Sequence, residues 1–212
     1  AIYETRGVAV AVADGEPQLQ ECELSEIGSH GVLVTGTGNP VLESCRITFA
    51  GGHGVFALEQ ATGRLRDCDI WGTTAAAVAV TGAARPSFQD GTIAAGGDGI
   101  ALLVDADAAP TLHGTALQGA TTAVMVQGSG RPVLEKASVN GNGGLAINVI
   151  DTARLTIRDA TVAGCEQTAI SVSGGALDLK STLVEGSRLA LRLAGGANAT
   201  LTACEVRDAG TA

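Results

Sequence analysis

The chain repeats itself about every 23 residues, and this period restricts its possible folds more than any other feature of the sequence. Two columns of apolar residues follow the period, with one residue per repeat. The first column contains Leu19, Leu42, Leu65, Phe88, Leu112, Leu134, Ile157, Leu179 and Leu201. The second contains Leu24, Ile47, Ile70, Ile93, Leu117, Val139, Val162, Val184 and Val206. A fixed internal period of this kind predicts a stack of similar structural units.

A third set of apolar residues precedes both columns, as pairs of residues two positions apart. We assign these pairs as Val8/Val10, Val32/Val34, Val55/Ala57, Val78/Val80, Ile100/Leu102, Val124/Val126, Ile147/Val149, Ile170/Val172 and Leu191/Leu193. Apolar and polar residues alternate within each repeat, which is typical of β-strands. The sequence therefore predicts an all-β parallel β-helix solenoid with about nine coils and three short strands per coil. We expect right-handed coils, because parallel crossover connections are almost always right-handed.

A column of small residues lies between the two apolar columns and predicts a sharp corner between the second and third strands. It contains Cys22, Cys45, Cys68, Gly91, Thr115, Ala137, Ala160, Thr182 and Cys204. We expect Cys22, Cys45 and Cys68 to be buried and reduced, because they behave as small hydrophobic residues at this corner. The chain has five cysteines, which cannot all pair, and this number favours a reducing cytoplasm.

The repeat frame G-[VI]-x-V … P-x-L-x-x-C-x-[IL] resembles that of the right-handed parallel β-helices of the pectin-lyase-like superfamily, over the whole chain. The resemblance implies the fold. It implies no single function, because the superfamily contains polysaccharide lyases and hydrolases, phage tail fibres, adhesins and non-catalytic interaction domains.

Length and charge restrict the remaining possibilities. The unbroken period predicts one domain over residues 1–212. The chain has no initiator Met and ends within a coil at Thr211 and Ala212, so we expect a domain cut from a longer protein. A net charge of −9 disfavours nucleic acid, and no apolar run is long enough to predict a membrane span. Eleven Arg against two Lys, with abundant Ala and Gly, indicate a bacterial source. We expect no cofactor and no metal.

Three polar residues are candidates for an enzymatic alternative, a secreted polysaccharide lyase or glycoside hydrolase with a pectin-like substrate and a degenerate site. Gly52-His53-Gly54 resembles the G-H-G motif of polygalacturonases, but the N-T-D and D-D motifs of that family are absent. Asp67 and Asp90 share one column and resemble the carboxylates with which pectate lyases hold Ca²⁺. We interpret them as solvated corner residues, because Asp favours turns. The chain has one Trp, one Tyr and three Phe, which disfavours a carbohydrate groove.

The outward positions of the first strand predict an interaction surface. We assign this row as Ala9, Leu33, Phe56, Ala79, Ala101, Met125, Asn148, Ser171 and Arg192, with Leu103 and Ile150 extending it. The matching row of the second strand is polar: Gln20, Glu43, Arg66, Gln89, His113, Glu135, Arg158 and Lys180. Exposed apolar patches commonly mark interaction sites.

The sequence therefore predicts a non-catalytic scaffold that binds a protein partner or a second copy of itself. The expected contact residues are Leu33, Phe56, Leu103, Met125 and Ile150. We expect this domain to belong to a larger protein, similar to the bacterial cytoplasmic proteins in which such repeats are fused to an ATPase or a regulatory domain.

Overall fold

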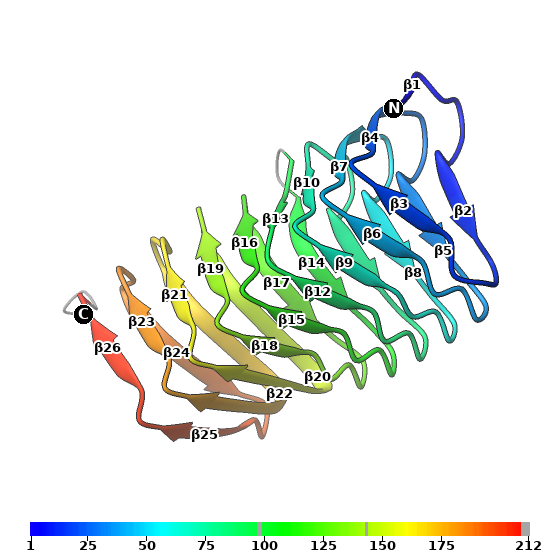
Figure 1. Cartoon of the computed structure of the whole chain (residues 1–212). Coiled ribbons are helices and arrows are strands. Elements are labelled where there is room, and N and C mark those ends of the chain that lie inside the picture. Colours follow the sequence, from blue (N-terminus) through cyan, green and yellow to red (C-terminus); the bar gives the residue numbers. More distant parts are fainter. Residues whose placement is uncertain (97–98, 143, 209–212) are drawn as a thin grey trace.

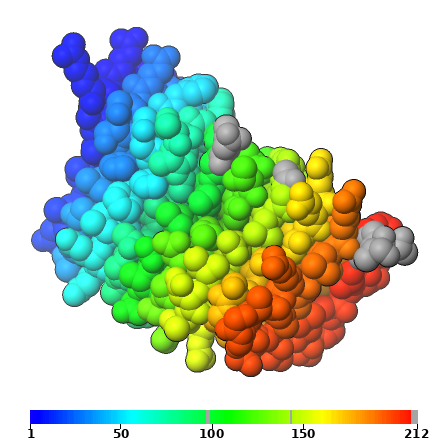
Figure 2. Space-filling view, turned by 180° about the vertical axis from the view of Figure 1, so that it is seen from behind, coloured from blue at the N-terminus to red at the C-terminus, as the bar shows by residue number. Residues whose placement is uncertain are grey.

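The computed structural model describes residues 1–96, 99–142 and 144–208. These residues form 26 strands that wind into successive coils along one axis, with the two chain ends at opposite ends of the rod (Figure 1). From behind, the colours follow the sequence in order along the molecule, because each coil contacts the coils before and after it (Figure 2). The predicted parallel β-helix is confirmed. Residues 209–212, which contain the expected end of the last coil, lie outside the described residues.

Each coil contributes three strands. The first strands are β2 (Val10–Val12), β5 (Val32–Val34), β8 (Val55–Ala57), β11 (Val78–Val80), β14 (Ile100–Val104), β17 (Thr122–Val126), the first parts of β20 (Leu145–Arg158) and β22 (Thr168–Lys180), and β24 (Leu189–Ala194). The second strands are β3 (Gln18–Gln20), β6 (Val41–Glu43), β9 (Arg64–Arg66), β12 (Ser87–Gln89), β15 (Thr111–His113), β18 (Val133–Glu135), the last parts of β20 and β22, and β25 (Asn198–Thr202).

The third strands form a separate ten-stranded parallel sheet. They are β1 (Ile2–Tyr3), β4 (Glu23–Ile27), β7 (Arg46–Ala50), β10 (Asp69–Trp71), β13 (Thr92–Ala94), β16 (Ala116–Gly119), β19 (Ser138–Gly141), β21 (Thr161–Ala163), β23 (Leu183–Glu185) and β26 (Glu205–Arg207). First and second strands belong to one 16-stranded sheet, because β20 and β22 continue through the corner between them.

The two predicted apolar columns form the core. Leu42 pairs with Leu65, and Ile47 pairs with Ile70, so like residues stack on like residues from coil to coil. These side chains are buried in the middle of the rod. Burial of each one contributes roughly 1.5–3 kcal/mol, which explains why the column positions are almost uniformly Leu, Ile or Val. In the last described coil, Val206 of the same column is half exposed.

The third set of apolar pairs is wrong in two coils. Val10 and Val12, not Val8 and Val10, pair with Val32 and Val34. In the fifth coil, Leu102 and Val104 replace the predicted Ile100 and Leu102, because Val78 pairs with Leu102. A shift of two residues leaves the alternation of inward and outward positions unchanged, so the pattern alone cannot detect it. The correction moves Ala11 and Leu103 into the outward row, in place of Ala9 and Ala101.

A column of Gly and Ala at the start of each first strand also faces the interior. It contains Gly31, Gly54, Ala77, Ala101, Ala123, Ala146 and Ala169, all buried. A Cβ atom on Gly54 would lie 2.4 Å from Cγ2 of Ile70. The corner therefore brings the backbone close to the third-strand core column and leaves room for small side chains only.

The corner between the second and third strands begins with a left-handed residue in every coil. Its left-handed residues, with φ between 48° and 67°, are Glu21, Ser44, Asp67, Asp90, Gly114, Lys136, Asp159, Ser181 and Ala203. The next residue belongs to the predicted small column. Where that residue is Cys or Thr, its side chain donates to the carbonyl oxygen two residues earlier, as in Thr182 to Lys180 (3.0 Å) and Cys68 to Arg66 (3.3 Å). This hydrogen bond explains the preference for Cys and Thr beyond their small size.

We expect Ile70→Asp to unfold the chain. Ile70 is fully buried between Ile47 and Ile93, where an added carboxylate has no partner and should cost more than about 3 kcal/mol. Urea denaturation followed by circular dichroism measures the loss. Gln89→Asp, which adds the same carboxylate at an exposed position of β12, should change the stability by less than about 0.5 kcal/mol. Equal stability of the two variants would contradict the assigned core.

Candidate functional site

The outward row of the first strands runs along the rod without interruption. With the corrected register it contains Ala11, Leu33, Phe56, Ala79, Leu103, Met125, Asn148, Ser171 and Arg192. The structure therefore places four of the five predicted contact residues in one row. Ile150 lies two positions along the strand from Asn148, in the neighbouring row that also contains Ser173.

A second row on the same face adds apolar residues that the sequence analysis missed. In β14, β17 and β20 the first and fourth residues are half buried, whereas the second, third and fifth are buried. The first residues are Ile100, Thr122 and Leu145, which pair with one another from coil to coil. The two-residue error in the fifth coil had placed Ile100 inside the core. Its half-buried position enlarges the apolar surface beside Leu103.

The two rows differ from the second-strand face in charge. From the second to the seventh coil they contain His30, His53, Ala76, Ile100, Thr122 and Leu145 in one row and Leu33, Phe56, Ala79, Leu103, Met125 and Asn148 in the other. On the second-strand face, in contrast, Glu43 pairs with Arg66. Glu135 lies 3.4 Å from Arg158 and 3.7 Å from His113. We call these two rows, together with Ile150, the first-strand face.

His53, a candidate catalytic residue, takes part in the packing of this face. The His30 and His53 rings stack with centroids 5.3 Å apart, and the Phe56 ring contacts both, at 5.2 and 4.9 Å. The backbone N–H of His53 donates to Nδ1 of His30, and Nδ1 of His53 lies 3.0 Å from the carbonyl oxygen of Ala76. Both Nδ1 atoms therefore have partners within the fold, and acceptance at Nδ1 requires a neutral His30. Burial, and then the neighbouring His53, lower the pKa of His30.

The other two candidate catalytic residues lie elsewhere. Asp67 and Asp90 have φ angles of 50° and 57° at the corner between second and third strands, and Asp67 lies 3.8 Å from Nε of Arg66. His53 precedes the first strand β8, at a different corner of the coil. The structure therefore brings Asp67 and Asp90 to one corner and keeps His53 apart from them. Across the described ranges, no group of three or more His, Cys, Asp or Glu residues is arranged to hold a metal ion.

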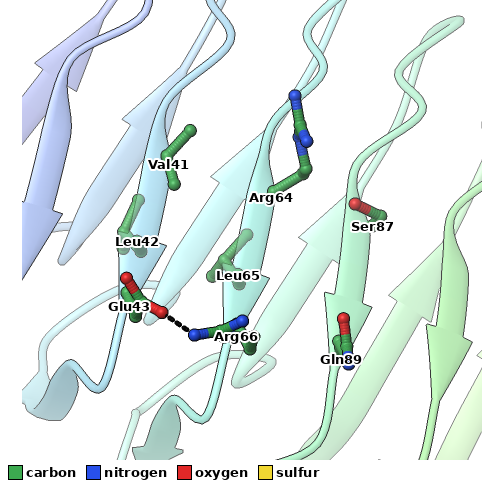
Figure 3. Close-up of a pocket in the computed structure, with 8 residues that line it drawn as sticks. All are labelled: Val41, Leu42, Glu43, Arg64, Leu65, Arg66, Ser87 and Gln89. Atoms are coloured by element: carbon green, nitrogen blue, oxygen red, sulfur yellow. Dashed lines mark hydrogen bonds and ion pairs between the residues drawn. The ribbon is translucent and has the colours of Figure 1, made fainter.

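A trough of about 300 Å³ lies on the second-strand face (Figure 3). Val41, Arg64 and Ser87 line one side of it, and Glu43, Arg66 and Gln89 line the other. The Glu43–Arg66 pair joins adjacent coils along one edge (Figure 3). The volume is at the lower end of the range of small-molecule sites, and the side chains flank the trough as two rows along the strands.

An exposed aromatic pair on the third-strand side was also missed. The Phe49 and Trp71 rings meet edge to face at 5.0 Å and are 53% and 41% exposed. Phe49 has a φ of 52°, a left-handed conformation that is unusual for a bulky residue. The neighbouring coil has Gly72 at this corner, also with a positive φ. Two of the few aromatic residues in consecutive coils were a signal that could have identified this pair.

Comparison with known families agrees with the architecture. A family model described as "Right handed beta helix region" matches residues 6–115. The chain belongs to this family, which confirms the predicted handedness of the coils. No curated protein matches the chain. None of the described segments forms a helix that is long and apolar enough to cross a membrane.

The neutral state of His30 predicts a pH-dependent contribution to stability. Because the pKa of His30 is lowered below its usual 6.5, the unfolded chain takes up the proton first as the pH falls. The contribution of His30 is therefore complete above pH 6.5 and decreases below it. We expect the stability difference between the wild type and His30→Ala to be smaller at pH 5 than at pH 8, by urea denaturation. A larger difference at pH 5 would mean that His30 is charged in the folded protein.

Proposed function

We propose that this chain is a non-catalytic scaffold that binds protein through its first-strand face. The observation that supports this most is a contrast within one row. Asn148, Ser171 and Arg192 occupy the same position in later coils as Leu33, Phe56 and Met125 in earlier ones. The fold therefore accepts polar residues in this row, and folding alone does not explain the apolar ones.

The uniform coils favour a surface over a catalytic cleft. The spacing along the column from Leu19 to Leu201 stays between 22 and 24 residues, so no coil carries a long insertion. Functional residues are generally found on loops carried by a rigid scaffold. A solenoid with few loops offers mainly its flat faces, and the first-strand face is the uncharged one in a chain of net charge −9.

The proposed setting is a larger bacterial protein of the cytoplasm, in which these coils accompany an ATPase or a regulatory domain. The Arg-rich, Ala- and Gly-rich composition and the odd number of cysteines support this proposal. The alternative, a polysaccharide lyase or glycoside hydrolase, is supported by the family resemblance. The separation of His53 from Asp67 and Asp90 counts against it, because the three candidate catalytic residues do not meet at one site.

Phe56→Glu should abolish association while leaving the fold intact. Phe56 is half buried among other side chains of the face, and truncation of such an anchor costs on the order of 2 kcal/mol, or about 30-fold in affinity. A buried carboxylate in the complex should cost more. Sedimentation velocity measures self-association, and affinity purification from a bacterial extract, quantified by mass spectrometry, measures partners.

Two variants make this test specific. Gln89→Glu adds the same charge on the second-strand face and should retain every association. Trp71→Glu places the same charge in β10, within the exposed Phe49–Trp71 pair. If Trp71→Glu removed the association and Phe56→Glu retained it, the binding surface would be the third-strand side instead. Turnover of a polyuronic acid that is lost in His53→Ala would support the enzymatic alternative.

A further inference from the structure

Three cysteines occupy consecutive coils at the corner between second and third strands. The N–H of Arg46 donates to the carbonyl oxygen of Cys22 at 2.8 Å, and the N–H of Asp69 donates to that of Cys45 at 2.9 Å. The flanking strands are in register on both sides of this corner. The Cα atoms of successive cysteines are therefore about 4.8 Å apart. This separation falls within the range of roughly 4.4–6.8 Å that a disulfide requires.

The thiols of Cys45 and Cys68 point in the same direction. Sγ of Cys45 donates to the carbonyl oxygen of Glu43 in its own coil and lies equally close, at 3.4 Å, to that of Leu19 in the preceding coil. Cys68 repeats this arrangement with Arg66 and Leu42, at 3.3 and 3.7 Å. Each sulfur is therefore directed toward the coil before it, where the next cysteine of the column lies.

Two of the three cysteines, Cys22 and Cys45, line a hollow of about 270 Å³ over this corner. The lining residues are Glu21, Cys22, Glu23, Ser44, Cys45, Arg46, Asp67 and Asp69. Cys22 is half buried, so its predicted burial is wrong. Cys45 and Cys68 are buried as predicted. Because four carboxylates and one guanidinium surround the opening, it favours a neutral oxidant over an anionic one.

The neighbouring thiol favours the thiolate form of Cys45. Contact with the Cys68 thiol is the largest influence on the pKa of Cys45 and lowers it, which outweighs the opposing effect of burial. The same contact, together with burial, raises the pKa of Cys68. The thiolate is the form of cysteine that peroxides oxidise.

We propose that Cys22 and Cys45 form a peroxide-sensitive dithiol that closes to a disulfide between the first two coils. The Cys45 thiolate attacks one oxygen of hydrogen peroxide or an organic hydroperoxide. The O–O bond breaks, Cys45 becomes a sulfenic acid, and the leaving oxygen takes up a proton as water or an alcohol. The Cys22 sulfur then attacks the Cys45 sulfur, the S–O bond breaks, and water leaves with the Cys22 proton. Two thiols are oxidised and one peroxide is reduced. The proposal is independent of the first-strand face.

The chain contains a matched control in Cys204. Cys204 belongs to the same corner column, is half buried, and donates to the carbonyl oxygen of Thr202 at 3.5 Å. The coil before it carries Thr182 at this position, so Cys204 has no thiol below it. Any oxidation that depends only on exposure at this corner should affect Cys204 as readily as Cys22.

The test is oxidation of the native 212-residue chain with hydrogen peroxide at pH 7, followed by blocking with N-ethylmaleimide, a neutral reagent. Mass spectrometry counts the remaining thiols. Digestion after Glu residues separates Cys22 from Cys45. We expect two of the five thiols to be lost, with the separated Cys22 and Cys45 peptides linked and Cys204 alkylated. Equal oxidation of Cys204, or a Cys45–Cys68 disulfide, would overturn the proposal.

Three variants test the separate roles. Cys22→Ser should prevent the disulfide and leave a sulfenic acid on Cys45 that dimedone labels. Cys68→Ala should slow disulfide formation roughly tenfold at pH 6, because it removes the neighbouring thiol that favours the Cys45 thiolate. Cys204→Ser should react like the wild type. Small residues already occupy this column in other coils, and thermal unfolding verifies that each variant folds. Unchanged oxidation in Cys22→Ser would refute the assigned pair.

Discussion

Parallel backbone hydrogen bonding between coils is the interaction on which the rest of this structure depends. Because each strand pairs in register with its counterparts one coil earlier and later, every residue lies about 4.8 Å from the equivalent residue of the next coil. Each position must therefore suit its neighbours above and below as well as its own coil. The Leu, Ile and Val columns satisfy this requirement in the core, and the Gly and Ala column satisfies it where Gly54 approaches Ile70.

The sequence predicted those parts of the fold that depend on this repetition. The core columns, the three strands per coil and the small corner residues all recur at a fixed spacing. The two-residue error at Ile100 arose because alternation is unchanged by a shift of two, and only the pairing of Val78 with Leu102 resolves it. Contacts that occur once in the chain were not predictable in this way. The Phe49–Trp71 pair and the bond from His53 to Nδ1 of His30 depend on individual corner geometry.

In the candidate site, too, the residues that follow the period were predicted and the others were not. The period identified Leu33, Phe56, Met125 and Leu103 as outward residues of one face, although Leu103 was placed beside the row and not in it. The two-residue error assigned Ile100 to the core, and Leu145 escaped notice because a half-buried first residue of a strand has no distinct alternation signal. The partners of the His30 and His53 rings were not predictable, since a sequence does not show which ring nitrogen meets a backbone group.

In a repeat protein, comparison of the equivalent residues of different coils shows what the fold requires at each position. Where equivalent coils carry different residues in the same backbone conformation, folding alone does not select the residue. Asn148 shows this for the row of Phe56, and Ala137 shows it for the column of Cys45. The corner of Phe49 gives a different result, because Glu26 in the preceding coil and Gly72 in the next one share its left-handed conformation, so the fold accepts both large and small residues there. A residue such as Phe56, whose equivalents include polar and small side chains, is one that folding alone does not explain.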